Sequence, residues 1–328
     1  MNETTRFVAC VSSFYNVNNG NHIQIARTDT RKMSSSFASL LPEAFRRPSN
    51  VDWCEANYVY SPWIAEAWNT ASSVPMTGVA FLGLYHARQA LLWESRWFWA
   101  WMMLAVVGVG SALFHATLLH VFQAADELPM LYCNLVFVYL MVEEKAVPKK
   151  WRAGGETNEN AVLRTSRRAW LVPLLVSVGL SQTFMYFAYP SVYEVFMGSY
   201  VTVIAWLIWR SVKLAWYSDD STLLQKTLVR ITLTCYGGAS ALWVFENAVC
   251  GVHGEENGGW AMQVAHLHAV WHTGACCGTY HFIQFCAARR GGALGLDVRS
   301  GGGENWYSPL FVKHGLVKGK GKHLPKRE

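Results

Sequence analysis

The sequence predicts an all-α, polytopic membrane protein with seven transmembrane helices and a metal site inside the helix bundle. The chain of 328 residues is 52% hydrophobic and only 15% charged, whereas soluble globular domains usually carry about 25% charged residues. The apolar residues are gathered into long blocks separated by short polar segments, which is typical of membrane-spanning helices. Histidines recur near the ends of two of these blocks, and they indicate where the metal would bind.

Residues 1–50 are polar and rich in Ser, Thr, Asn and Arg. The apolar run at 7–11 is too short for the hydrophobic region of a signal peptide. We expect a disordered leader here, although the Ser- and Arg-rich stretch 27–47 weakly resembles a transit peptide. Residues 51–287 then form the predicted seven-helix domain, and residues 288–328 form a basic cytosolic tail.

Seven apolar stretches are each close to the roughly 20 residues that cross a bilayer as a helix. They cover residues 73–93, 97–119, 127–144, 169–189, 191–212, 227–249 and 260–286. The first is the weakest, because Tyr85, His86 and Arg88 interrupt it. The fourth and fifth are separated only by a tight turn at Pro190.

Lysine and arginine set the expected orientation in the membrane. They are concentrated between the third and fourth spans, around the loop after the fifth span and in the tail, whereas 120–126 and 250–259 contain none. Basic loops remain mostly on the cytosolic side. We therefore expect a luminal N-terminus and a cytosolic C-terminus, in a multi-pass protein of the endoplasmic reticulum or Golgi. The modest net charge of +6 lies in these regions, which argues against a nucleic-acid partner.

Three histidines fall at the outer level of the membrane in this topology: His115 in the second span, and His268 and His272 in the seventh. Residues four apart share one face of a helix, so His268 and His272 could bind one metal ion. A single intramembrane histidine is often a packing residue, but three at one level favour a metal site. We predict zinc, because calcium and magnesium prefer oxygen ligands. Three protein ligands leave a fourth position for water.

Other histidines fit this site less well. His120 follows His115 by five residues, and we expect it at the water interface. His266 lies only two residues from His268, so on a helix it would point elsewhere.

Two further side chains are candidates for catalysis. Ser111 precedes His115 by one helical turn and could donate a hydrogen bond to a developing oxyanion. Asp126, at the start of the third span, could take and return the proton of water. Each has a structural alternative, since Ser111 could be a small residue at a helix interface and Asp126 could be an N-cap. Together with zinc, these residues predict hydrolysis of an amide or ester in a membrane lipid.

Three blocks of sequence, in order, resemble the alkaline ceramidase family. They are DWCEANY and SPWIAEAWNT at 52–58 and 61–70, GVGSALFHATL and DELPM at 108–118 and 126–130, and HAVWH at 268–272. The resemblance runs from about residue 51 to residue 287. It implies a seven-span zinc hydrolase, related to adiponectin-type receptors, that cleaves the amide of ceramide to a sphingoid base and a fatty acid. Its site would use the histidines, Ser111 and Asp126 named above.

The resemblance also implies a calcium site before the first span. Its ligands would be Asp52, the backbone carbonyl of Trp53, Glu55, Asn57 and Glu66. Such an oxygen-rich set suits a hard cation. Without the resemblance, an acidic turn that holds no ion is the simpler interpretation.

A disulfide between Cys54 and Cys250 is a further implication, because both cysteines match the family pattern and both fall on the expected outer, oxidising side. The other cysteines in apolar segments are expected to be packing residues. One departure from the family concerns Glu246, which stands where the family usually has Asp.

Alternative hypotheses keep the fold but change the function. The substrate could be phytoceramide, dihydroceramide or a glycerolipid ester. The protein could instead be a seven-span receptor whose zinc is structural, or a haem protein with two histidine ligands. Ser111 and Asp126 beside the three histidines favour a hydrolase, because neither a receptor nor a haem protein needs these two residues.

Overall fold

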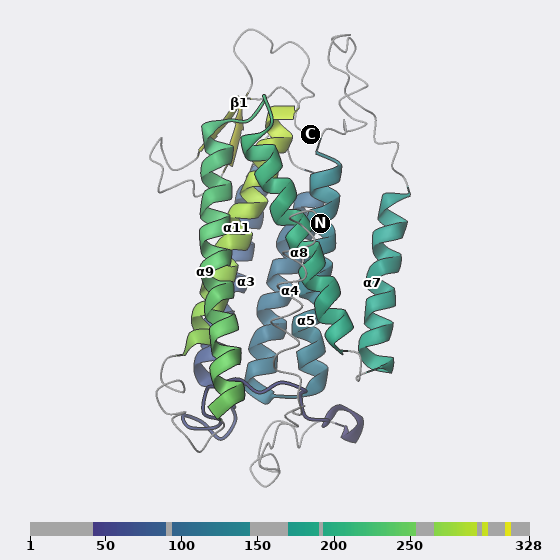
Figure 1. The fold of residues 1–328 in the computed structure, drawn as a ribbon, viewed down its shortest axis with the longest axis vertical. Helices are drawn as coiled ribbons and strands as arrows, with labels where there is room; N and C mark the ends of the chain where they lie inside the picture. The colour runs from purple at the N-terminus through teal and green to yellow at the C-terminus, as the bar shows by residue number, and fades with distance from the viewer. Residues whose placement is uncertain are drawn as a thin grey trace.

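The computed structural model describes residues 42–89, 94–144, 170–189, 193–253, 266–293, 297–300 and 312–315. Within these ranges the chain forms seven α-helices arranged as a bundle, and a short pair of strands at one end (Figure 1). The helices are α3 (Ala67–Gln89), α4 (Ser95–Thr117), α5 (His120–Val142), α7 (Leu171–Ala188), α8 (Tyr193–Trp216), α9 (Leu223–His253) and α11 (Leu267–Ala293). A 3-10 turn, η2 (Glu43–Phe45), precedes them.

The protein is a membrane protein, because five of the described helices are long and apolar enough to cross a bilayer: α4, α5, α7, α8 and α9. The remaining two, α3 and α11, have 23 and 27 residues, which gives lengths of about 34 and 40 Å. They are less apolar because they carry polar side chains into the bundle. That all seven helices span the membrane stays a prediction.

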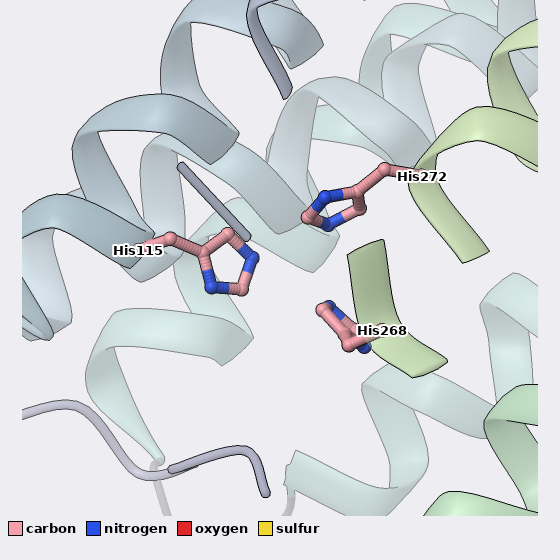
Figure 2. A group of neighbouring side chains, drawn as sticks. All are labelled: His115, His268 and His272. Carbon is pink, nitrogen blue, oxygen red and sulfur yellow. The ribbon is translucent and has the colours of Figure 1, made fainter. Parts of the chain in front are cut away.

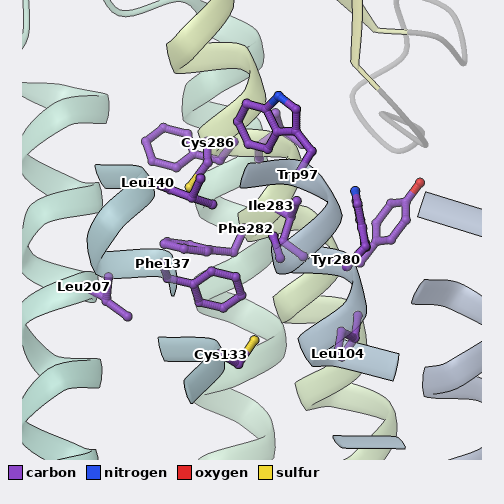
Figure 3. Close-up of a cluster of buried hydrophobic side chains, with 14 of the residues drawn as sticks. Trp97, Leu104, Cys133, Phe137, Leu140, Leu207, Tyr280, Phe282, Ile283 and Cys286 are labelled. Carbon is purple, nitrogen blue, oxygen red and sulfur yellow. The ribbon is translucent and has the colours of Figure 1, made fainter. Parts of the chain in front are cut away.

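The core of the bundle lies between α3, α4, α5 and α11, with α9 packed along α11 and α7 at the periphery beside α5 and α8 (Figure 1). Figure 3 shows part of the large apolar cluster in this core. Its labelled members are Trp97, Leu104, Cys133, Phe137, Leu140, Leu207, Tyr280, Phe282, Ile283 and Cys286. The cysteines in this cluster are free thiols, as expected for packing residues.

The connection between α4 and α5 is only two residues long. Leu118 adopts a left-handed conformation with φ of 50° and ends α4. Residues 47–66 run across this turn, and their backbone pairs with it. Ser49 N–H donates to Leu118 C=O, and His120 N–H donates to Arg47 C=O, each at 2.9 Å. Glu66 N–H donates to His115 C=O at 2.9 Å, so this strap brings Glu66 directly beside His115.

The pairing of the strap with the α4–α5 turn explains why two predictions, the start of the third helix and the exposure of His120, are wrong. The third predicted helix begins at His120 rather than 127, so Asp126 lies inside α5 and is not its N-cap. His120 is 6% exposed and stacks on Tyr186 with ring centroids 5.5 Å apart, rather than facing water. Residues 47–50 cover the turn and shield this histidine.

The last helix, α11, continues to Ala293, seven residues beyond the end of the seventh predicted span at 286. Beyond it, β1 (Asp297–Ser300) pairs antiparallel with β2 (Val312–Gly315), and Val298 packs against the apolar core. Residues 1–41 of the predicted leader (1–50), the basic loop at 145–169 and most of the tail lie outside the described residues, whereas 42–50 include η2 and the start of the strap.

Near the β1 end of the bundle, two consecutive arginines on α11 are almost fully buried. Arg290 binds both carboxylate oxygens of Glu94, at 2.8 and 3.1 Å, and donates to the Glu144 carbonyl at 2.9 Å. Arg289 binds the carboxylates of Glu144 at 3.2 Å and Asp220 at 2.9 Å. This network joins α11 to the residues that flank α4, α5 and α9. We call this end of the bundle the arginine end.

Candidate active site

Three histidines from distant parts of the sequence face one another (Figure 2). They lie at the end of the bundle opposite the arginine end. His115 comes from the last turns of α4, and His268 and His272 come from the first two turns of α11. All three are at most 4% exposed, and each offers a ring nitrogen within 4.8 Å of the others. Among the described residues this histidine triad is the one group of its kind.

The rings of two triad members are oriented by hydrogen bonds to Nδ1. His115 Nδ1 contacts the carboxylate of Glu66. His272 Nδ1 lies 2.8 Å from Ser72 Oγ and 3.2 Å from Ser73 Oγ. His115 Nε2 is then buried without a hydrogen-bond partner, which is costly unless a ligand completes it. A donor set of imidazoles with one nitrogen free and the other held by a polar neighbour fits zinc.

The third ring, His268, is held differently. The indole of Trp53 stacks on it at 3.7 Å between centroids, with an interplanar angle of 21°. Its Nδ1 lies 3.5 Å from a carboxylate oxygen of Glu246. The sequence assigned Trp53 only a carbonyl ligand for calcium and gave Glu246 no role, because stacking between residues 215 positions apart leaves no local pattern.

Ser111 and Asp126 lie next to the triad. Ser111 is 1% exposed, and its Oγ lies 3.5 Å from His272 Nε2. Ser73 donates a hydrogen bond to Ser111 Oγ at 3.0 Å, and the Asp126 carboxylate is hydrogen-bonded to Ser111. The two predicted catalytic residues are therefore brought together with the predicted metal ligands, at one wall of the triad.

A close helix contact makes this arrangement possible. A side chain at Gly110 would place its Cβ 1.9 Å from the carbonyl oxygen of Ala125. That carbonyl receives no bond from position 129, because Pro129 lacks an N–H. The α4 backbone can therefore approach α5 closely, which sets Ser111 against Asp126.

The residues predicted to bind calcium lie in the strap, but hydrogen bonds occupy most of their oxygens. Both carboxylate oxygens of Asp52 accept from Asn57 Nδ2 at 3.1 Å, and Asn57 Oδ1 is buried without a partner. Glu55 accepts the backbone N–H groups of Trp68 at 2.7 Å and Asn69 at 2.9 Å. Glu55 thus caps the start of α3, whose first N–H groups have no partner within the helix.

Glu66 lies between the predicted calcium ligands and the histidine triad. Its carboxylate accepts from Trp53 N–H and from Asn69 Nδ2, both at 3.1 Å, and contacts His115. Asp52 also comes within hydrogen-bonding reach of it. Burial raises the pKa of Glu66 to about 8, against the opposing effect of these donors. Two carboxylates so close together in a buried place favour either a shared proton or a bound cation.

Cys54 is disulfide-bonded in the structure. Cys250 lies in α9, but its side chain is outside the part of the chain that the structure describes. The pairing of Cys54 with Cys250 therefore stays a prediction.

Sequence reasoning missed several side chains of this site: Ser72, Ser73 and the contact of Glu66 with His115. The available signal was the presence of hydroxyl and acidic groups at the start of an apolar stretch, where such groups usually face the protein interior. Their partners could not be named, because the facing helix is distant in sequence.

A second buried carboxylate, Glu127, was also missed. It accepts hydrogen bonds from Tyr186 at 2.7 Å, Tyr193 at 2.6 Å and Gln123 at 3.1 Å. These donors come from α7, α8 and α5, so Glu127 faces away from Ser111 and ties the peripheral helices to the site.

Comparison with known proteins points to one family. The family model described as Ceramidase matches residues 46–297. The chain is 32% identical over 266 residues to dcd3A of Dictyostelium discoideum, a protein assigned provisionally as an alkaline ceramidase; the match covers 72% of this chain and 85% of that protein. Mouse alkaline ceramidase 3 is 44% identical over 95 residues, which are 29% of this chain and 35% of the mouse protein. Yeast alkaline ceramidase YPC1, from Saccharomyces cerevisiae, is 33% identical over 162 residues, 48% of each chain.

Proposed function

Because the chain belongs to the ceramidase family, we propose that it hydrolyses the amide bond of ceramide within the membrane, releasing a sphingoid base and a fatty acid. The observation that carries the proposal is the buried histidine triad with Ser111 and Asp126 against it, at one end of a bundle of apolar helices. A lipid can reach such a site from the bilayer. A water-soluble substrate would not need a site at the end of a membrane-spanning bundle.

Zinc is the proposed cofactor, held by His115, His268 and His272. Zinc in a site with three protein ligands acidifies water to a pKa of about 7 and polarises a carbonyl oxygen. The orphaned Nε2 of His115 and the all-nitrogen donor set support this choice over calcium or magnesium.

Two side chains of the protein then have separate roles: one transfers the proton, and the other stabilises the negative charge that develops on the carbonyl oxygen. Asp126 accepts a proton from the attacking water and returns it to the nitrogen of the leaving sphingoid base. Ser111 donates a hydrogen bond to the oxygen that becomes negatively charged as the amide carbonyl is attacked. In the resting site the Ser111 hydroxyl donates to the Asp126 carboxylate. Once Asp126 has taken the proton of water, it donates to Ser111 Oγ instead, which frees the Ser111 O–H for the oxyanion.

We also propose the calcium site in the strap, formed by Asp52, the Trp53 carbonyl, Glu55, Asn57 and Glu66. The support is the unpartnered Asn57 Oδ1 and the approach of the Asp52 and Glu66 carboxylates to each other. A calcium ion there would neutralise these groups and fix the strap on the triad. The proposal also includes the Cys54–Cys250 disulfide, a luminal N-terminus and a cytosolic C-terminus in the endoplasmic reticulum or Golgi.

Hydrolysis of ceramide by purified protein in detergent tests the activity. The wild-type protein is compared with itself after a zinc chelator, and with His268→Ala. His281→Ala is the matched control, because His281 lies on the same helix but its Nδ1 faces the Cys277 carbonyl at 2.8 Å. We expect release of sphingoid base from the wild type and the control, and none after chelation or from His268→Ala.

Folded, zinc-containing wild-type protein that releases no sphingoid base from any ceramide would contradict the amidase proposal. Release of fatty acid from a glycerolipid ester under the same conditions would redirect it to an esterase. Full activity in His268→Ala would remove zinc from the mechanism.

A further inference from the structure

We propose that Glu246 is the positioning residue of His268, so that all three members of the histidine triad present Nε2 to the metal. The inference rests on the proposed zinc site and extends it to a residue on a third helix. Glu246 lies on α9, which contributes no ligand, and it is 2% exposed.

The first observation is a pair of buried, unpartnered atoms that face each other. Glu246 Oε2 and His268 Nδ1 are 3.5 Å apart, and neither has a hydrogen-bond partner in the structure. Leaving a buried polar atom unpaired is costly. An approach of about 0.6–0.8 Å from the observed 3.5 Å would turn this pair into a charge-assisted hydrogen bond, which is about 2.7–2.9 Å long.

The second observation is that Glu246 is anchored to the helix start that carries His268. The backbone N–H groups of Cys54 and His268 donate hydrogen bonds to its carboxylate. His268 is the second residue of α11, where N–H groups lack partners within the helix. One carboxylate therefore holds both the backbone and the ring of the same residue.

The third observation concerns the plane of the ring. Trp53 stacks on His268 at 3.7 Å, so the imidazole cannot turn away without losing this contact. With the ring plane fixed by Trp53 and Nδ1 directed to Glu246, Nε2 is left for the metal.

The set is complete only with Glu246. His115 Nδ1 is held by Glu66, and His272 Nδ1 is held by Ser72 and Ser73. An acceptor on Nδ1 fixes the tautomer of a metal-binding histidine and increases its basicity. Each ligand thus has its own acceptor, drawn from the strap, from α3 or from α9.

Zinc affinity is the test, measured by competition with a chromogenic chelator on the full-length protein in detergent. Glu246→Gln keeps the shape of the side chain but removes its charge, and we expect its dissociation constant for zinc to rise about 10–100-fold. Glu246→Asp keeps the charge on a shorter side chain and should recover part of that loss.

Glu144→Gln is the matched control, because Glu144 is a buried carboxylate at the arginine end. It should lower the Tm of zinc-free and zinc-bound protein equally and leave zinc affinity unchanged, which is the behaviour of a purely structural carboxylate. Glu246→Gln should instead lower mainly the Tm difference that zinc produces.

The outcomes separate the two proposals. No zinc binding by the wild type would overturn the metal site itself. Equal zinc affinity of folded Glu246→Gln and wild type would overturn only the role of Glu246. If the Gln variant does not fold, nitrogen NMR of zinc-bound wild-type protein decides, since metal on Nδ1 of His268 contradicts the inference and a protonated Nδ1 supports it.

Discussion

The two ends of the helix bundle bury charged and polar groups in opposite ways. At the arginine end, Arg289 and Arg290 are 2% and 1% exposed, and they bind the carboxylates of Glu94, Glu144 and Asp220 and the Glu144 carbonyl. No buried side-chain atom of this network is left unpartnered in the described part of the chain. At the triad end, His115 Nε2, Asn57 Oδ1 and Asn69 Oδ1 are buried and have no partner.

The difference separates groups that hold the fold from groups that await a ligand. Charges that satisfy one another, as at the arginine end, need nothing beyond the fold to explain them. An orphaned buried atom costs about 1–3 kcal/mol, so several at one place indicate a site whose partner is not part of the chain.

The largest expected effect tests the triad end. Asp126→Asn should reduce kcat by about 100–10,000-fold, the usual contribution of a general acid–base group, while zinc content stays near that of the wild type. Glu127→Gln is the matched control, because this neighbouring carboxylate faces Tyr186 and Tyr193 instead of Ser111. Steady-state ceramide hydrolysis with metal analysis measures both, and equal losses of kcat would contradict the role of Asp126.

At the arginine end the expected effect is on stability alone. Arg290→Ala leaves the Glu144 carbonyl without this donor and removes one of the two arginines that pair with Glu94, which keeps Arg96 at 3.2 Å. Breaking a buried ion pair costs about 3–5 kcal/mol, and the remaining arginine places the expected loss at the lower end of that range. The Tm of zinc-free protein should fall accordingly, while the dissociation constant for zinc is unchanged. A matching loss of zinc affinity would show that the two ends are not independent.

A pair of glycine variants tests the close contact behind Ser111 and Asp126. Gly110→Ala places a methyl group against the Ala125 carbonyl, and overpacking of this kind costs about 1–3 kcal/mol or more. Gly78→Ala, on α3, meets nothing within 4 Å and should stabilise its helix by up to about 1 kcal/mol. Thermal unfolding compares them; similar Tm values for the two variants would refute the contact.

The smallest effect is expected from Ser72→Ala. His272 Nδ1 loses its partner at 2.8 Å but keeps Ser73 at 3.2 Å, so zinc affinity should fall by about tenfold or less, at the lower limit for loss of a metal-orienting partner. The chelator competition assay used for Glu246 measures it. A loss as large as that of His272→Ala would mean that Ser73 cannot substitute.

Much of the fold could be predicted, but helix ends could not. The sequence places the first helix at residue 73, whereas α3 begins at Ala67. The reason is a cap from outside the helix: the carboxylate of Glu55 accepts the N–H groups of Trp68 and Asn69. No local pattern in residues 67–72 predicts this cap, because Glu55 lies more than ten residues away in the sequence.

The sequence by itself determined the membrane class, the family and the three histidines, because apolar blocks and a four-residue spacing are local properties of the chain. The structure confirmed that these histidines converge. Only the tertiary structure decided which groups orient them: Glu66 from the strap, Ser72 from α3 and Glu246 from α9. Those contacts join segments that are distant in sequence, and they depend on helix packing such as that of Gly110 on Ala125. Hydrogen-bond partners across a bundle are set by which helix faces which, and that follows from the packing of the whole molecule.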